Sequence, residues 1–366
     1  MTADLPPWAF AAALAGLPFM GWERLTALLA EAEGDPGAAW QRVVAGRAGA
    51  AWAKAAASVS PEGVATAHSA AGVAVHLHGD DSYPEGLAGD HEAPPVLFTR
   101  GSLSALDEGI PRVAMIGTRR CSGYGRDVAR EFGRELAAAG VCVVSGLAIG
   151  IDGASHEGAL AAAPAGARPV AVVGSGLDVV YPRRHASLWR AVAESGLIVS
   201  EAPLGARPEQ WRFPARNRII AALSHVLVVV ESHPAGGSQH TVRSAEQRGV
   251  PVMAVPGPIR SHASAGTNRL LSEGCAPACD VDDVLVALAL ETAGAPAGSR
   301  RLDLRPPPEA ADAAVLAALG WEAVSLEEVL VRTGLAPGRV AVALAHLEQD
   351  GWARGTAGWW ERVGAQ

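Results

Sequence analysis

Two hydrophobic patterns divide the chain into segments of different structure. Residues 1–65 are rich in Ala, Leu and Trp, and Leu14, Leu17, Leu25 and Leu28 recur at helical spacing, which predicts a small helical domain. From Gly72 onward, short apolar runs rich in β-branched residues alternate with amphipathic stretches. The runs predict strands at 73–77, 96–99, 112–117, 141–146, 169–174, 197–201, 225–231 and 251–257. The amphipathic stretches predict helices at 124–139, 151–163, 186–195, 216–223 and 238–248.

The predicted strands are apolar along most of their length rather than at alternate positions. Such strands are buried on both faces, and the helices between them form the crossovers of a parallel sheet. We therefore predict an α/β domain over 66–290, with an extended Rossmann-like, doubly wound and mostly parallel sheet.

The composition changes again before the C-terminal part. Residues 291–310 are rich in Pro, Gly and Ala, which predicts a linker. Beyond it we predict three helices, the second opened by a capping box between Ser325 and Glu328, and then a hairpin that carries Trp352 and Trp359. Three helices followed by a hairpin are typical of a winged helix, which we place at 311–366. The chain is therefore predicted to have a small all-α N-terminal domain, a central α/β domain and a C-terminal winged helix.

The net charge of −8 conceals an asymmetry along the chain. Residues 112–270 hold 18 Arg against 11 Asp and Glu, whereas residues 311–366 hold 4 Arg against 7 Asp and Glu. A locally basic surface attracts a polyanion whatever the net charge, so the middle of the chain is compatible with nucleic acid. An arginine bias without functional meaning explains the composition equally well. For the acidic winged helix we expect a protein contact or a regulatory role.

Several classes of protein are excluded or disfavoured by what the sequence lacks. The single lysine, Lys54, is not part of a Walker A motif, and no G-x-G-x-x-G follows a predicted strand. The four cysteines show no disulfide or zinc spacing, and we expect no metal and no cofactor. No nucleophile elbow appears, so we assign no catalytic residue and expect no enzyme activity. Without a signal peptide or an apolar stretch of about 18 residues, we expect a cytoplasmic protein with no membrane contact.

The loops that follow the predicted strands carry the candidate binding site. Ligands of open parallel sheets bind beyond the carboxyl ends of the strands, where helix N-termini offer free N–H groups. Five such loops, 117–125, 145–153, 174–185, 213–221 and 233–241, are rich in glycine, hydroxyl side chains and arginine. Arginine side chains and glycine turns suit phosphate, so we predict a polyanion or nucleotide site. The candidates are Arg119, Arg120, Ser145, Gly146, Gly150, Arg183, Arg216, Asn217, Arg218, Gly237, Ser238 and Thr241.

Other residues in or near these loops receive plainer interpretations. Asp152 is at least as well explained as a helix cap as by ligand contact, and His156 is expected on a helix face or behind the site rather than as a general base. The middle of the chain offers little aromatic surface, so stacking is expected to matter less than phosphate pairing; its aromatic residues include Tyr181, Trp189, Trp211 and Phe213. At 17–29 the sequence has the outline of a helix-hairpin-helix module, but Phe19 replaces its first glycine, which favours helix packing over DNA contact.

An ordered set of motifs resembles the DprA/Smf family of DNA-processing proteins. The set comprises V-A-M-I-G-T-R-R-C-S-G-Y-G, V-V-S-G-L-A-I-G-I-D-G-A-S-H, V-V-G-S-G-L-D-V-V-Y-P and F-P-A-R-N-R-I-I-A-A-L-S, followed by A-V-P-G and G-T-N-R-L-L. The resemblance spans roughly 75–285. One departure is Gln239-His240, where the family usually has an apolar pair.

The resemblance implies a recombination mediator without enzyme activity. Such a protein binds single-stranded DNA without sequence preference, forms a homodimer through its Rossmann-like domain, and loads the RecA recombinase onto DNA covered by single-strand binding protein during natural transformation. By motif, Arg119 and Arg183 are expected to grip phosphates, with Arg216 and Arg218 as further candidates. The backbone at 145–150 and at 237–238 would supply N–H donors.

Two alternatives remain open. Rossmann-like nucleotide phosphoribohydrolases share a related core with a P-G-G-x-G-T loop and use an arginine and a glutamate, whereas this chain has A-G-G-S-Q-H-T and its next carboxylate is Glu246. A nucleotide or nucleic-acid sensor with the winged helix as its output is the second alternative.

Overall fold

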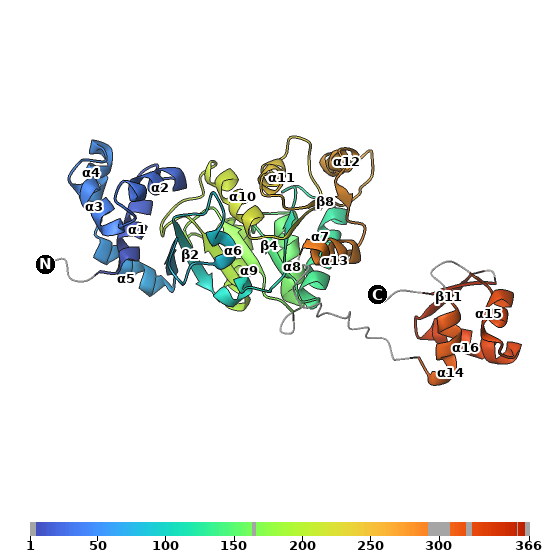
Figure 1. Cartoon of the computed structure of the whole chain (residues 1–366). Helices are drawn as coiled ribbons and strands as arrows, with labels where there is room; N and C mark the ends of the chain where they lie inside the picture. The colour runs from blue at the N-terminus through green and yellow to red at the C-terminus, as the bar shows by residue number, and fades with distance from the viewer. Residues whose placement is uncertain (1–4, 163–165, 292–307, 320–323, 357, 363–366) are drawn as a thin grey trace. The chain divides into compact units, whose positions relative to one another are not determined.

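A computed structural model describes residues 5–162, 166–291, 308–319, 324–356 and 358–362 of the chain (Figure 1). They fall into two compact units, Met1–Gly298 and Ser299–Gln366. Most of the linker predicted at 291–310 lies outside the described residues. None of the helices within these ranges is long and apolar enough to cross a membrane.

The first unit is built on a mostly parallel sheet, as predicted. Among the described residues its strand order is β1-β2-β6-β5-β4-β3-β7-β8-β9. All neighbours from β6 to β9 are parallel, whereas β2 pairs antiparallel with β6 and β1 antiparallel with β2. The strands are β1 (Ala74–Leu77), β2 (Val96–Gly101), β3 (Arg112–Ile116), β4 (Cys142–Ser145), β5 (Val170–Val173), β6 (Leu197–Ser200), β7 (Val226–Val229), β8 (Val252–Ala254) and β9 (Ala276–Pro277).

Helices cover both faces of this sheet because successive strand residues point to opposite sides. In β3, Ala114 and Ile116 pack with one set of helices, and Val113 and Met115 pack with the other. The first set is α6 (Glu85–Ala88), α10 (Arg212–Ala222), α11 (Ser238–Glu246) and α12 (Ala265–Ser272). The second is α7 (Gly123–Ala138), α8 (Ile151–Ala161) and α13 (Val281–Glu291). Helix α10 begins at Arg212, four residues before the predicted start, and β9, α12 and α13 were not predicted.

The N-terminal residues form the expected helical bundle. Its helices are α1 (Pro7–Ala15), α2 (Trp22–Ala30), α3 (Pro36–Val44), α4 (Ala50–Ala56) and α5 (Pro61–Ala71). Proline at the first position of α1, α3 and α5 suits a helix start, where no N–H is needed. Leu14 of α1 shares a hydrophobic core with Phe98 of β2, Ile198 of β6 and Trp189 of α9 (Ala186–Ser195). The bundle therefore belongs to the same compact unit as the sheet.

The second unit has the winged-helix elements that the sequence predicts. Helices α14 (Ala310–Ala318), α15 (Leu326–Thr333) and α16 (Pro337–Gln349) accompany the antiparallel strands β10 (Val324–Ser325), β12 (Trp359–Arg362) and β11 (Ala353–Thr356), in that order. Ser325 caps α15 by accepting a hydrogen bond of 3.2 Å from the Glu328 amide. Gly334 ends the helix at φ 62°, a conformation that favours glycine.

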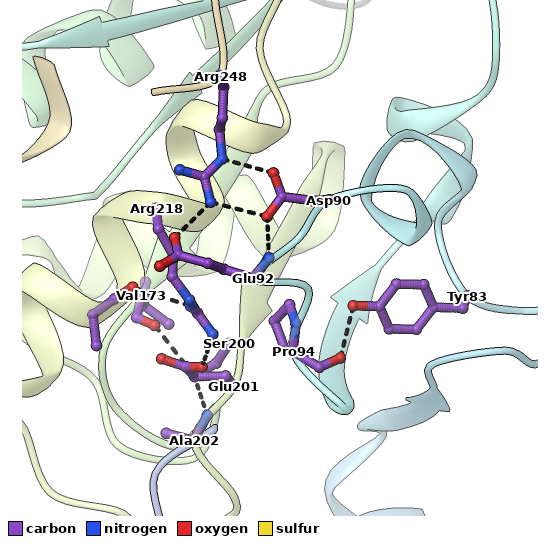
Figure 2. Close-up of polar contacts among 11 residues, drawn as sticks. Tyr83, Asp90, Glu92, Pro94, Val173, Ser200, Glu201, Ala202, Arg218 and Arg248 are labelled. Atoms are coloured by element: carbon purple, nitrogen blue, oxygen red, sulfur yellow. Dashed lines mark hydrogen bonds and ion pairs between the residues drawn. The ribbon is translucent and has the colours of Figure 1, made fainter. Parts of the chain in front are cut away.

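Ion pairs fasten the segment around α6 to Arg248, in the turn that follows α11 (Figure 2). Arg248 donates to Asp90 at 2.6 and 2.9 Å and to Glu92 at 2.7 Å, and its side chain is 5% exposed. Burial alone would raise the pKa of Asp90, but the hydrogen bonds and charge of Arg248 outweigh burial and hold that pKa below its usual value. Within the segment itself, Tyr83 donates to the carbonyl of Pro94 at 2.8 Å and holds its two ends together.

Loss of Arg248 is expected to destabilise this unit strongly. Arg248→Ala should lower the free energy of unfolding by about 3–5 kcal/mol, because it leaves Asp90 buried without its counter-charge. The control Arg269→Ala breaks a pair whose side chains are 62% and 50% exposed, and should cost about 0.5 kcal/mol or less. Denaturant unfolding of the three proteins measures both effects, and an equal loss in the two variants would contradict the assigned role of Arg248.

Candidate nucleic-acid interface

The loops after β3, β5 and β7 and the start of α10 surround one cleft at the carboxyl edge of the parallel strands. Its volume is about 860 Å³, and it narrows into a small inner pocket beside Gly146 and Gly174. Parallel strands bring their following loops to one edge, which explains why segments far apart in sequence meet here. The residues that line the cleft include Thr118, Arg119, Arg120, Ala148, Asp152, Tyr181, Phe213, Arg216, Asn217, His233, Gly236, Gly237, Ser238, His240 and Thr241.

Arg216 is buried at the base of this cleft and organises the surrounding loops. Its Nη1 donates to the carbonyl of Gly146 at 2.7 Å and to that of Val172, and its Nη2 lies 3.7 Å from Asp152 Oδ2. A Cβ on Gly146 would lie 2.1 Å from Nη2, so only glycine leaves room for the guanidinium. Burial lowers the pKa of Arg216 to about 10, against the opposing charge of Asp152, and the side chain remains cationic at neutral pH.

An exposed arginine and two aromatic rings form the outer part of the cleft. The guanidinium of Arg119 lies 4.9 Å from the centre of the Phe213 ring, a cation–π arrangement. The rings of Phe213 and Tyr181 are 5.6 Å apart and inclined by 39°, and Tyr181 is 40% exposed. The cleft therefore combines a cation that can reach a phosphate with aromatic faces that can contact a base.

The glycine loop before α11 forms another wall. Gly236, Gly237 and Ser238 line the cleft, and the Ser238 hydroxyl lies 2.7 Å from the hydroxyl of Ser232. Gln239, one of the two residues that depart from the resembled family, donates through Nε2 to the same Ser232 hydroxyl at 3.3 Å. The other, His240, lines the cleft. The loop thus presents backbone, rather than apolar side chains, to a ligand.

The structure brings most of the predicted site residues together and separates four of them. Arg119, Arg120, Arg216, Asn217, Gly237, Ser238 and Thr241 line the cleft, and Gly146 lines its inner pocket. Ser145 is buried and donates to the carbonyl of Met115 at 2.5 Å. Gly150 has φ 93° and packs against the carbonyl of Thr118, where a Cβ would lie at 2.4 Å.

The other two separated residues are arginines. Arg183 is exposed on a short 3₁₀ turn, Arg183–His185, and is not among the residues that line the cleft. Arg218 donates to Glu201 at 2.7 Å, and its guanidinium lies 4.8 Å from the centre of the Trp22 ring. Arg218 therefore faces the N-terminal helices rather than the cleft. Contact of the four separated residues with DNA stays a prediction.

Sequence reasoning gave too little weight to Phe213 and Tyr181. Both were noted only as members of a sparse aromatic set, yet they lie side by side next to Arg119. A usable signal was present, because Phe213 precedes Arg216 by three residues, and three-residue spacing places side chains on one side of a helix. That signal required α10 to begin at Arg212, before the predicted start.

His156 is fully buried on α8, behind the cleft. Neither ring nitrogen makes a hydrogen bond of normal geometry to a described residue, although the backbone of Ser145 lies close to the ring. Burial lowers the pKa of His156 to about 3, and the nearby charge of Arg216 acts in the same direction. The imidazole is therefore neutral at physiological pH, and it is buried near Arg216 rather than among the residues that line the cleft.

The fold and the cleft together define a Rossmann-like protein with a glycine-lined, arginine-bearing site suited to an anionic ligand. The family model described as DNA recombination-mediator protein A matches residues 74–289, and the model of the DprA winged helix domain matches residues 301–358. The chain belongs to the DNA recombination-mediator protein A (DprA) family, which confirms the resemblance of its motifs.

Individual relatives agree with this assignment. The chain is 39% identical to the putative DNA processing protein DprA of Mycobacterium tuberculosis over 75% of this chain and 70% of the relative. It is 36% identical to protein Smf of Escherichia coli, over 79% and 77%. Among solved structures, DprA of Streptococcus pneumoniae matches with a TM-score of 0.64 and 29% identity, over 77% of this chain and 98% of that one. DprA of Helicobacter pylori, described by its single-stranded DNA binding mode, matches with a TM-score of 0.53 and 28% identity, over 60% and 96%.

The buried imidazole makes stability depend on pH. The folded chain keeps His156 neutral, whereas the unfolded chain takes up a proton below a pKa of about 6.5, so stability is lost as the pH falls from about 6.5 toward 3. His156→Leu should reduce the slope of the unfolding free energy between about pH 4 and 6 by about 1.4 kcal/mol per pH unit. Denaturant titrations at several pH values measure the slope. Stability at pH 8, where the imidazole is neutral in both states, is the control for lost packing. An unchanged slope would show that His156 is not the titrating group.

Proposed function

We propose that this protein binds single-stranded DNA without sequence preference in the cleft at the sheet edge. The observation that carries the proposal is the Arg119 guanidinium stacked on Phe213 beside Tyr181, in the same cleft that the glycine loop at Gly236–Ser238 lines. An arginine and backbone amides suit phosphates, and aromatic faces suit the bases of a strand without a partner. Phosphate and stacking contacts are common to all four nucleotides, so they do not select a sequence.

Single-stranded DNA fits this site better than a duplex does. The rings of Phe213 and Tyr181 can stack only on a base that is not already stacked and paired within a helix. The solved structure of the Helicobacter pylori relative is described by its single-stranded DNA binding mode, which supports the same ligand here.

The phosphoribohydrolase alternative is less well supported by the cleft. That chemistry uses a glutamate near the bound nucleotide, whereas within the described lining the one carboxylate is Asp152, which lies 3.7 Å from Arg216. Glu231 follows β7 but is 1% exposed and accepts hydrogen bonds from the amide and hydroxyl of Ser122. These contacts favour a binding protein with no reaction of its own.

The downstream role that we propose is to load RecA onto DNA covered by single-strand binding protein, in natural transformation. Support comes from the family, whose description is that of a recombination mediator. We further propose a homodimer formed through the Rossmann-like unit. Helix α13 exposes Val286 and Leu290, at 63% and 74%, on one side of that unit, which supports such a contact. Sedimentation of the full chain tests the oligomeric state.

Loss of the Arg119 side chain should weaken DNA binding. Arg119→Ala is expected to cost about 1–3 kcal/mol of affinity for labelled oligo-dT, because one charge-assisted contact is lost and the Phe213 ring loses its partner. Fluorescence anisotropy measures the affinity, with duplex DNA and free nucleotides as competitors. The control is Arg134→Ala, which removes an exposed arginine from the later part of α7. Equal affinity of both variants would argue against the cleft, and competition by a mononucleotide with release of free base would favour the phosphoribohydrolase.

Loading of RecA is tested separately from binding. On DNA already covered by single-strand binding protein, the wild-type chain should accelerate the DNA-dependent ATPase of RecA, and Arg119→Ala should require a higher concentration for the same effect. If the wild-type chain binds the oligonucleotide but leaves RecA activity unchanged, the mediator role is contradicted while the binding site stands.

A further inference from the structure

The turn between α1 and α2 holds an aromatic ring out in solvent at an energetic cost. Phe19 is 81% exposed and has φ 58°, a left-handed conformation that is unfavourable for residues other than glycine. The turn is fixed on both sides, because Arg24 donates to the Phe19 carbonyl at 2.8 Å and Trp52 Nε1 donates to the Pro18 carbonyl at 3.0 Å. Since the ring is not packed, folding does not explain why phenylalanine rather than glycine stands here.

A small groove lies between the end of this turn and the start of α10. Met20, Gly21 and Trp22 form one side of the groove, and Trp211 and Arg212 at the start of α10 form the other. The next residue of α10, Phe213, already lines the cleft. The guanidinium of Arg218 lies over the Trp22 ring at 4.8 Å and holds α2 against α10. Three consecutive residues, Trp211, Arg212 and Phe213, therefore lead from the groove beside the N-terminal turn to the cleft.

The surface along this groove is aromatic rather than strongly cationic. Trp211 is 43% exposed, and the Arg212 guanidinium lies 4.4 Å from the centre of its ring. Arg212 lies 3.6 Å from Glu209, and Arg218 donates to Glu201, so the positive charges are largely offset. Exposed rings with few net charges suit nucleic-acid bases better than phosphates.

We propose that a single DNA strand leaving the cleft continues over Trp211 to Phe19, so that the N-terminal helical bundle is part of the DNA-binding surface. This inference rests on the proposed function, because the cleft must bind the strand first. Base stacking on Trp211 and Phe19 extends the site beyond the nucleotides held next to Arg119. The exposure of Phe19 and its strained backbone then have a common explanation, because the turn presents the ring to a base.

Oligonucleotide length separates this inference from the proposed function. Anisotropy with oligo-dT from about 4 to 24 nucleotides should show wild-type affinity rising until the strand spans both parts. Phe19→Gly removes the ring and relieves the backbone, so the variant should be at least as stable as the wild type. It should lose about fivefold or more of the affinity for long oligonucleotides and keep the affinity for short ones. Trp211→Ala should have the same effect.

The matched control removes an exposed apolar side chain from the second unit. Val331→Ala, at a residue that is 80% exposed on α15, should leave the length dependence unchanged. If short oligonucleotides do not bind the wild-type chain, the proposed function fails. If they bind but affinity does not rise with oligonucleotide length, the path over the N-terminal bundle is overturned. It is also overturned if affinity rises with length in Phe19→Gly and Trp211→Ala as much as in the wild-type chain.

Discussion

The buried guanidinium of Arg216 is the interaction on which the cleft depends. A cation with so little exposure requires acceptors on several sides, and here they are main-chain carbonyls at the ends of β4 and β5 and the carboxylate of Asp152. Because these acceptors belong to different strands and loops, one side chain from α10 holds the sheet edge in register. The same arrangement requires glycine at position 146, because a methyl group there would occupy the space of the guanidinium.

Because Arg216 is fixed at the bottom of the cleft, the inner and outer residues of the cleft have different roles. Arg216 is committed to the protein, so contact with an anionic ligand is left to arginines that reach solvent, such as Arg119 over the Phe213 ring. The aromatic rings beside it supply contact area that does not depend on charge. The N-terminal bundle shares a hydrophobic core with the sheet, so the cleft and the α1–α2 turn belong to one compact unit.

The sequence was sufficient for the fold and for much of the site, because both follow from regular patterns. Short apolar runs rich in β-branched residues, such as that at 226–229, are typical of interior strands, and loops that follow parallel strands meet at one edge. Side-chain direction was beyond these patterns. Ser145, Arg183 and Arg218 carry suitable chemistry in suitable loops, but hydrogen bonding to Met115, position on a separate turn and pairing with Glu201 decide where they point. The short strand β9 was missed because two residues carry no periodic signal.

The pairing of Arg216 with Asp152 has a consequence for the ions that surround a DNA strand. A phosphate releases condensed counter-ions only when a protein charge is available to replace them, and a guanidinium 3.7 Å from a buried carboxylate offers little of its charge. Arg216 thus shapes the cleft without adding to counter-ion release. In the proposed DNA complex, that release depends on the exposed arginines of the cleft. The DNA-binding role proposed for this protein is suited by a site in which different residues hold the loops together and replace the counter-ions.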